Sequence, residues 1–244
     1  MEDFGFRKVN RDEKQHLVNE VFESVAFRYD LMNDIMSAGL HRLWKDTLID
    51  WLAPRKNKHL IDVAGGTGDI AFRFLSRLKD QGKVTIVDRN EQMLLEGRSR
   101  YTSSSRKSNI DWICADAMEL PFSDESYDYF TISFGIRNVL DIKKCLEEAY
   151  RVLKPGGRLL ILEFSSVDNK TLKKLYDLYS LNIVPKLGRF VTGDEDSYRY
   201  LVESIRKFPD QEEFLRMIDT SGFKQTKFRN LTFGVVAIHS GWKV

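Results

Sequence analysis

The sequence predicts an α/β fold, in which a mostly parallel seven-stranded sheet has helices on both faces, a helical extension before it and an antiparallel hairpin at its C-terminal end. Three observations support this prediction. Short apolar runs alternate with helix-like stretches from Leu60 onwards, which is the pattern of a parallel sheet. A glycine-rich segment follows the first of these runs. The 244 residues, of which 42% are hydrophobic, suffice for one compact core.

Residues 1–57 are expected to form a helical N-terminal extension. Apolar residues recur there at intervals of three and four, which is the spacing of an amphipathic helix. One run begins at Val18, and a second ends before Pro54. The apolar positions are Val21, Phe22, Val25, Tyr29 and Met32 in the first run, and Leu43, Trp44, Leu48, Trp51 and Leu52 in the second.

Residues 58–165 are expected to form the core of the domain. Five apolar runs predict its parallel strands, at residues 60–63, 84–87, 112–115, 129–133 and 158–164. The clearest helix between them begins after Asp141, a residue type that caps helices, and has an apolar face from Ile142 to Leu153. A Lys-Pro-Gly-Gly turn at residues 154–157 stops this helix and leads into the fifth strand.

The remaining residues are expected to supply a helical insertion and the last two strands. The insertion, residues 166–221, shows helical spacing at 196–207 and 210–220. Two final apolar runs, at 224–229 and 234–239, predict the antiparallel hairpin of residues 222–244. The sequence contains no internal repeat or linker, so a single domain is expected.

The composition excludes several classes of protein. The chain has 38 Lys plus Arg and 36 Asp plus Glu, and this balance points to no nucleic-acid partner. No apolar run approaches the ~20 residues of a membrane-spanning helix, and residues 1–10 lack the core of a signal peptide. Cys114, expected in a buried strand, and Cys145, on a helix face, indicate a reduced compartment. The four histidines lack ligand spacing, so no metal site is expected.

The glycine-rich segment, Asp62-Val-Ala-Gly-Gly-Thr-Gly68, joins a predicted strand to a predicted helix. Glycines at such a junction let the backbone approach a ligand closely, although a tight turn alone would also use them. Asp88 ends the next strand about 20 residues after Gly68, the spacing of a carboxylate that accepts both ribose hydroxyls. Asp116 ends the third strand, where it would bind an adenine amino group or cap a helix. Three such strand ends fit one adenosine better than a dinucleotide, and Asp69 in place of a lysine disfavours a pyrophosphate.

These features resemble the class I S-adenosylmethionine-dependent methyltransferases, whose Rossmann-like fold carries a glycine loop, a ribose-binding acid and an adenine-binding acid. The matching positions are Asp62 to Gly68, Asp88 and Asp116, and the resemblance covers about residues 58–165. It implies that this core binds S-adenosyl-L-methionine as the cofactor. Ala64 stands where that superfamily often has the first glycine of its loop.

Two longer segments are similar to signatures of the ubiquinone/menaquinone biosynthesis C-methyltransferase family. They are residues 29–44, YDLMNDIMSAGLHRLW, and residues 151–165, RVLKPGGRLLILEFS. Residues 132–138 and 196–206 are also similar, so the resemblance covers essentially the whole chain. It implies methylation of a ring carbon of a polyprenyl methoxy-benzoquinol in ubiquinone biosynthesis. The alternatives are a demethylmenaquinol methyltransferase, or a cofactor-binding scaffold in a quinone-synthesis complex.

The resemblance also implies which residues contact the cofactor. They are Thr67 in the glycine loop, Asp88 at the ribose, Asp116 with Ala117 around the adenine, and Ser133 after the fourth strand. The expected set is completed by Tyr29, Gly65 and Arg89. Tyr29 would cover the methionine moiety or else belong to the core.

Methylation of a ring carbon requires an ionised phenol, because a neutral phenol ring is a poor nucleophile and its pKa lies near 10. Arg137 and Asn138 follow the fourth strand and are the expected catalytic pair. Arg137 would stabilise the phenolate, since a guanidinium stays charged, and Asn138 would orient the same oxygen. His41 is a further candidate, as general base. The structural alternatives are an Arg137 paired with a carboxylate beyond the sheet, and a His41 that caps a helix or bonds Glu163.

Partners and location are expectations from the same resemblance. The segment 172–183 has an apolar face at helical spacing, and would be a lid, a homodimer contact, a membrane-facing patch or simply part of the core. The expected partners are therefore the quinol, a second copy of the chain, the membrane surface and other quinone-biosynthesis proteins. The start at Met1-Glu2-Asp3 favours a mitochondrial matrix enzyme, peripheral to the inner membrane. A bacterial cytoplasmic enzyme is the alternative.

Overall fold

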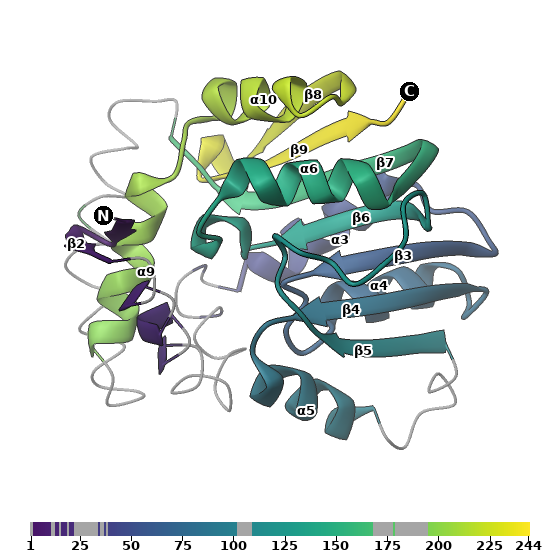
Figure 1. Cartoon of the computed structure of the whole chain (residues 1–244), viewed down its shortest axis with the longest axis horizontal. Helices are drawn as coiled ribbons and strands as arrows, with labels where there is room; N and C mark the ends of the chain where they lie inside the picture. Colours follow the sequence, from purple (N-terminus) through teal and green to yellow (C-terminus); the bar gives the residue numbers. More distant parts are fainter. Residues whose placement is uncertain are drawn as a thin grey trace.

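The computed structural model describes residues 2–10, 13–14, 16–18, 20–21, 34, 37, 39–101, 109–167, 178 and 195–244. Its centre is a seven-stranded sheet with the strand order β5-β4-β3-β6-β7-β9-β8 (Figure 1). The strands from β3 to β7 pair in parallel, whereas β9 runs antiparallel to both β7 and β8. The predicted sheet and its C-terminal hairpin are confirmed. The strands are β3 (Lys58–Val63), β4 (Gly82–Asp88), β5 (Ile110–Cys114), β6 (Tyr127–Ser133), β7 (Leu153–Phe164), β8 (Lys224–Leu231) and β9 (Val236–Trp242).

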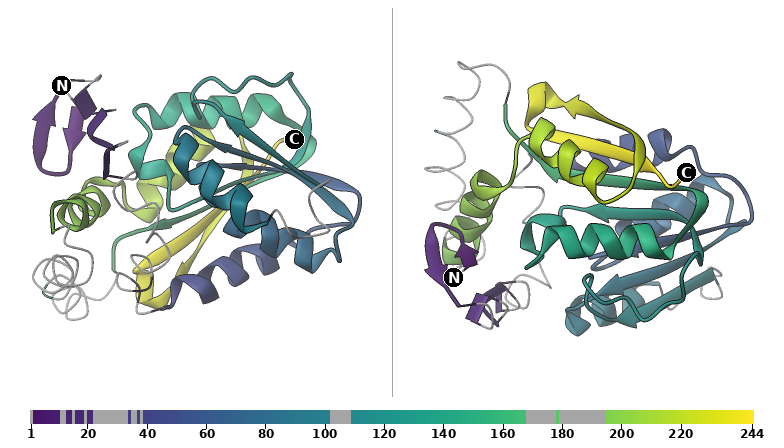
Figure 2. Two further views of the ribbon diagram at one scale, coloured as in Figure 1. Left: turned by 90° about the horizontal axis from the view of Figure 1, so that it is seen from below. Right: turned by 45° about the horizontal axis from the view of Figure 1, so that its top comes forward.

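Helices cover both faces of the sheet, as predicted (Figures 1 and 2). α3 (His41–Leu52) and α4 (Asp69–Arg77) pack on one face, and α6 (Ile142–Val152) and α10 (Gln211–Thr220) on the other. α5 (Glu91–Arg100) follows β4, and α9 (Glu195–Lys207) lies beyond the end of β6. Within the described residues, no helix is both long and apolar enough to cross a membrane.

Capping side chains set where three of these helices begin. Asp141 accepts the N–H of Lys144 at 3.0 Å, which confirms the predicted cap of α6. Asn90 and Asp210 make the same kind of bond at the starts of α5 and α10. Each bond satisfies an N–H that the helix itself leaves unpaired, and its loss typically costs about 1 kcal/mol.

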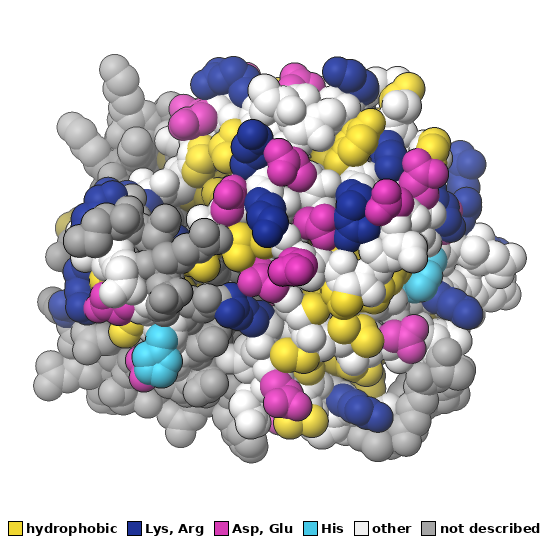
Figure 3. Space-filling view, viewed as in Figure 1, with side chains coloured by type: hydrophobic (Ala, Val, Ile, Leu, Met, Phe, Trp, Pro, Cys, Tyr) yellow, Lys and Arg dark blue, Asp and Glu magenta, His cyan; other side chains and the backbone are white. Residues whose placement is uncertain are grey.

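The face that carries α6 and α10 has acidic and basic side chains interspersed (Figure 3). On α6, Arg151 pairs with Glu148 at 2.6 Å and Lys143 lies 3.6 Å from Glu147. Charge on this face is therefore balanced locally as well as over the whole chain.

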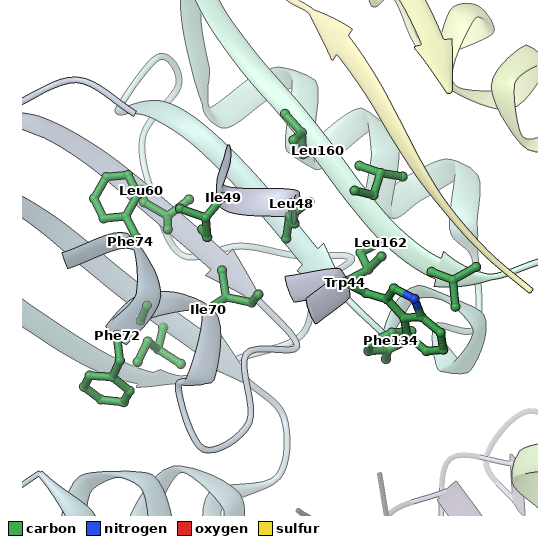
Figure 4. Packing of buried hydrophobic residues seen from close by; sticks show 14 of the residues in the cluster. Trp44, Leu48, Ile49, Leu60, Ile70, Phe72, Phe74, Phe134, Leu160 and Leu162 are labelled. Carbon is green, nitrogen blue, oxygen red and sulfur yellow. The ribbon is translucent and has the colours of Figure 1, made fainter. Parts of the chain in front are cut away.

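Aromatic packing on the opposite face fixes the chain where β6 ends (Figure 4). Trp44 of α3 lies beside Phe134, with ring centroids 6.2 Å apart, and Phe164 is 4.9 Å from the same ring. Phe134 has a φ of 58°, a left-handed conformation that costs roughly 1–2 kcal/mol for a residue with a Cβ. Burial of the ring offsets this cost and holds the segment that follows.

The N-terminal residues form a short hairpin that was not predicted. β1 (Glu2–Phe4) and β2 (Arg7–Val9) pair antiparallel. Three-residue strands are too short for a period of two to be recognised, so no strand was expected within the helical extension of residues 1–57. The second helix predicted there is α3. Most of the first, including Tyr29, lies outside the described residues.

Two further details differ from the prediction. β7 begins at Leu153, before the predicted Arg158, because the turn between them pairs with Lys243, the residue after β9. The Gly156 N–H donates to Lys243 O at 2.7 Å, and the Lys243 N–H donates to Gly157 O at 3.0 Å. Cys114 is exposed rather than buried, since it ends the edge strand β5.

A glycine is required at position 135 because Ala64, in the loop after β3, leaves no room for a Cβ there. Ala64 has a φ of 51°, and a Cβ built on Gly135 would lie 2.5 Å from the Ala64 Cβ. Gly135→Ala is therefore expected to lower the free energy of unfolding by roughly 1–3 kcal/mol in urea denaturation. In an Ala64→Gly background the same substitution is expected to cost less than about 0.5 kcal/mol, because coupled neighbours are not additive. Equal costs in both backgrounds would contradict this explanation.

Candidate functional site

A cleft opens where β3, β4, β5 and β6 end. It encloses about 870 Å³ of empty space, part of it open to solvent. Parallel pairing brings the residues after these strands to one edge of the sheet, which is where ligands bind in such folds. Five of the predicted site residues line the cleft: Asp88, Arg89, Asp116, Ala117 and Asn138.

The glycine loop turns sharply between β3 and α4. Gly66 and Gly68 have φ values of +53° and +86°, which favour glycine because it has no Cβ. Gly65 is constrained differently: a Cβ there would lie 2.8 Å from Ile86 Cγ2 and 2.9 Å from the Asp62 carbonyl oxygen. Gly65 therefore packs against the sheet, whereas Gly66 lines the cleft.

Asp88, the last residue of β4, is held by the backbone on both sides. Its Oδ2 accepts the N–H of Gly66 at 2.8 Å, and its Oδ1 accepts the N–H of Asn90 at 2.9 Å. Burial raises the pKa of Asp88, and these N–H donors act in the opposite direction. Each carboxylate oxygen can accept more than one hydrogen bond, so the fixed group retains acceptor sites for two hydroxyls.

Asp116 and Arg89 form an ion pair in the wall of the cleft. Arg89 Nη1 donates to Asp116 Oδ2 at 3.1 Å, and the side chains are 45% and 32% exposed. Asp116 Oδ1 accepts the N–H of Met118 at 2.8 Å. Asp116 thus closes a local turn, but no helix follows it in the described residues before β6, so the capping alternative is not confirmed; it also lines the cleft beside Ala117.

Asn138 ends a short 3₁₀ turn, η3 (Ile136–Asn138), after β6. Its Oδ1 accepts the O–H of Tyr200 at 3.0 Å. Its Nδ2 is buried and has no hydrogen-bond partner among the described residues. Buried donors are normally paired, so this nitrogen is a candidate for a bond to a ligand.

Arg137 pairs with Glu163 behind the cleft, as the structural alternative anticipated. Nη1 donates to Glu163 Oε1 and to the Phe134 carbonyl oxygen, both at 2.7 Å, and Nε lies 3.4 Å from Ser204 Oγ. In the part of the chain that the structure describes, Nη2 makes no hydrogen bond. Burial raises the pKa of Glu163, and the Arg137 charge opposes that shift.

A second hollow adjoins the cleft and shares Val139 and Leu140 with it. It encloses about 1040 Å³ of space, part of it open to solvent, and Arg137, Tyr200 and Phe208 also line it. Arg137 and Asn138, adjacent in sequence, therefore face two neighbouring spaces.

The other predicted site residues that the structure describes do not line the cleft, and Tyr29 lies outside the described residues. Ser133 Oγ is buried, with no hydrogen-bond partner in the described ranges. Thr67 and His41 line a separate polar hollow near Asp69. Burial lowers the pKa of the His41 imidazole. Ser37 Oγ lies 3.0 Å from His41 Nδ1, and it also accepts the backbone N–H of His41 at 3.2 Å. His41 is thus the first residue of α3, and it lines a different hollow from Asn138. Its hydrogen-bond partner is Ser37 rather than Glu163.

Several lining residues were not predicted. Met93, Met118 and Phe134 are the largest of them. Phe134 sits inside the segment that was singled out for Arg137 and Asn138, but its left-handed backbone has no sequence signal. Met93 follows Asn90, whose capping bond to the Met93 N–H at 3.1 Å identifies a helix that begins at the cleft.

Comparisons with known proteins agree with this geometry. The ubiE/COQ5 methyltransferase family matches residues 8–243. A ubiquinone/menaquinone biosynthesis C-methyltransferase UbiE from Dinoroseobacter shibae is 58% identical over 241 residues, which cover 99% of this chain and 96% of that protein. The protein of the same name from Paracoccus denitrificans is 56% identical with the same coverage. A solved SAM-dependent methyltransferase from Thermotoga maritima shares the fold, with a TM-score of 0.65 and 21% identity over 92% of this chain and 99% of that one. The chain belongs to the ubiE/COQ5 methyltransferase family.

Proposed function

We propose that this chain is an S-adenosylmethionine-dependent C-methyltransferase that methylates a ring carbon of a polyprenyl methoxy-benzoquinol in ubiquinone biosynthesis. Family membership supports the reaction, and the names of the bacterial relatives support a quinone pathway. The observation that carries the proposal is the cleft where Asp88, Asp116 and Asn138 converge. Because those names also include menaquinone, a demethylmenaquinol is the second candidate substrate.

The polar groups that line the cleft fit the hydrogen-bonding groups of the cofactor. The fixed carboxylate of Asp88 is suited to the ribose hydroxyls, and Asp116 with Ala117 is suited to the adenine. Gly66 leaves the space between them open, since a Cβ there would lie 3.0 Å from Met93 Cε. Gly65, Thr67 and Ser133 are each adjacent in sequence to a residue that lines the cleft. The cofactor, when bound, supplies an activated methyl group on a sulfonium.

The chain's own residues ionise the phenol and hold it. Asn138 Nδ2 is a buried donor without a partner in the described part of the chain, suited to bond the phenolic oxygen from the cleft. Arg137 offers Nη2 from the adjoining hollow, while Glu163 holds Nη1. Each unit by which these donors lower the phenol pKa corresponds to about 1.4 kcal/mol. Arg137 stays protonated, so the phenol proton leaves through water, and His41 takes no part.

Methyl transfer and product analysis test the proposal. The purified chain is expected to transfer labelled methyl from S-adenosylmethionine to a short-tailed methoxy-benzoquinol, and mass spectrometry is expected to place it on a ring carbon. Asn138→Ala is expected to lower kcat about 100-fold, the usual effect of removing one such donor, with the cofactor affinity nearly unchanged. Competition with a demethylnaphthoquinol decides between the two substrates. Cofactor binding without any transfer would favour the scaffold alternative and defeat the enzyme.

The location and partners are also proposals. The relatives named above are bacterial, which favours the bacterial cytoplasm and gives the mitochondrial matrix no support. The segment 172–183, expected to contact a second copy or the membrane surface, lies outside the described residues apart from Leu178. Sedimentation and vesicle flotation of the purified chain test the homodimer and the membrane contact separately.

A further inference from the structure

The hydrogen bond between Tyr200 and Asn138 joins α9 to the wall of the cleft. The donor and acceptor are 3.0 Å apart, although 62 residues separate them in sequence. The Tyr200 ring is 4% exposed, so water does not compete freely for its hydroxyl. Among the described residues, Asn138 Oδ1 is the only acceptor for that hydroxyl.

This bond determines which end of the Asn138 amide faces α9. A carboxamide fits a site in two orientations, and its neighbours decide between them. With the amide reversed, Nδ2 would point at the Tyr200 hydroxyl, whose proton would lose its acceptor. Without a ligand, each orientation leaves one buried donor unpaired, either Nδ2 or the Tyr200 hydroxyl, at a cost of about 1–3 kcal/mol. An oxygen bound in the cleft pairs Nδ2 only in the observed orientation, whereas the reversed amide would leave the hydroxyl unpaired and turn Oδ1 towards that oxygen. Burial also raises the pKa of Tyr200, so the hydroxyl remains a donor at neutral pH and Nδ2 is turned away from it.

The N-terminal hairpin holds Tyr200 from its other side. The Phe4 ring stacks on the Tyr200 ring, with centroids 4.1 Å apart and planes 15° from parallel. The Phe6 N–H donates to Glu203 Oε2 at 3.0 Å, one turn further along α9. A ring stacked on one side and hydrogen-bonded at its tip has few alternative positions. The contacts of Tyr200 with the N-terminal hairpin, which lie outside the cleft, therefore help to fix the position of Asn138 Nδ2.

We propose that Tyr200 is a positioning residue for Asn138. The Tyr200 hydroxyl holds Asn138 Oδ1, so that Asn138 Nδ2 is free to donate to the substrate oxygen. The identity of that oxygen rests on the proposed function, whereas the orientation of the amide does not. Tyr200 itself does not line the cofactor cleft, and it acts only through Asn138.

Kinetics of Tyr200→Phe test the proposal, because this variant keeps the ring and loses only the hydroxyl. We expect kcat to fall about 10-fold, as for the loss of one orienting bond, while the KM for the quinol and the Kd for S-adenosylmethionine stay within about 2-fold. Tyr198→Phe makes the same change at a fully buried tyrosine of the same helix and is expected to keep kcat. In an Asn138→Ala background, Tyr200→Phe is expected to have no further effect. A kcat loss that persists there, or a lower thermal midpoint with unchanged kcat, would overturn the proposal.

A second measurement needs no turnover. In protein labelled with ¹⁵N-asparagine, the side-chain amide signal of Asn138 is identified by its absence in Asn138→Ala. We expect this signal to shift in Tyr200→Phe and to stay in place in Tyr198→Phe. An unmoved signal in both variants would overturn the inference. Failure of the unaltered chain to transfer methyl would defeat the proposed function alone, since this signal would still report on the amide.

Discussion

Replacing Arg137 with alanine is expected to lower the free energy of unfolding by about 3–5 kcal/mol, the usual cost of removing one partner from a buried ion pair. The Arg137 and Glu163 side chains are only 4% and 1% exposed, with Nη1 and Oε1 2.7 Å apart. Burial already raises the pKa of Glu163 while Arg137 is present, so its loss leaves a buried carboxyl without its countercharge. Urea denaturation at pH 7 measures the change. A loss below about 1 kcal/mol would contradict the importance of the pair.

This instability makes Arg137→Ala a poor test of catalysis, because a scaffold would also fail if it unfolded. Arg137→Lys is sharper: an ammonium keeps a positive charge beside Glu163 but lacks the planar second nitrogen that Nη2 provides. We expect Arg137→Lys to retain stability within about 1–2 kcal/mol and to lower kcat roughly 10- to 100-fold. An unchanged kcat would remove Arg137 from the proposed mechanism, and its role would then be confined to holding Glu163.

The order of strands and helices was predictable because the central strands are covered on both faces and are therefore continuous apolar runs. The residues at which the strands begin and end were harder to predict. Lys58 and Gly82, neither of them apolar, begin β3 and β4 and pair with each other, and only the neighbouring strand supplies that pairing. The hairpin of β1 and β2 depends in the same way on α9, because two three-residue strands are not stable alone.

The residues of the cleft also differ in how well the sequence predicted them. Asp88 and Asp116 were predictable because Asp88 ends β4 and Asp116 lies two residues after β5, so the sheet fixes the place of each in space. The pairing of Arg137 with Glu163 was left open, since an arginine after β6 has the same sequence pattern whether it enters the cleft or lies behind it. The bond from Tyr200 to Asn138 was not foreseen at all, because α9 reaches the cleft only in the folded chain.

Asp62, beneath the glycine loop, is expected to make the protein less stable as the pH rises. Its side chain is 1% exposed, and its Oδ1 accepts the Thr131 hydroxyl at 2.8 Å. Oδ2 has no hydrogen-bond partner within the described residues. Burial raises the pKa of Asp62 to about 7, against the opposing effects of the Thr131 bond and the Lys45 charge. An unfolded chain would release the same proton near pH 4.

The sign of the effect follows from this raised pKa. The folded state binds the extra proton, so the stabilisation is complete below about pH 4 and is lost as the pH rises through about 7. Asp62→Asn removes this titration. From pH 4 to pH 8, the free energy of unfolding of the variant is expected to rise by about 4 kcal/mol relative to that of the unaltered chain. Urea denaturation of both proteins across this range measures the difference.

Asp128→Asn is the matched control, because its effect has the opposite sign. Burial raises the pKa of Asp128, but hydrogen bonds from Lys58 and the His59 N–H outweigh it and hold that pKa below its usual value. Its stabilisation is therefore present above the unfolded pKa of about 4 and is lost as the pH falls below it. This variant is expected to lose stability relative to the unaltered chain between about pH 3 and pH 5, and to keep a constant difference from there to pH 8. If the Asp62→Asn difference stayed constant with pH, Asp62 would be ionised in the folded protein. The nearby charge of Lys45, which is ion-paired with Asp69 at 2.8 Å, would then outweigh the cost of burying the carboxylate.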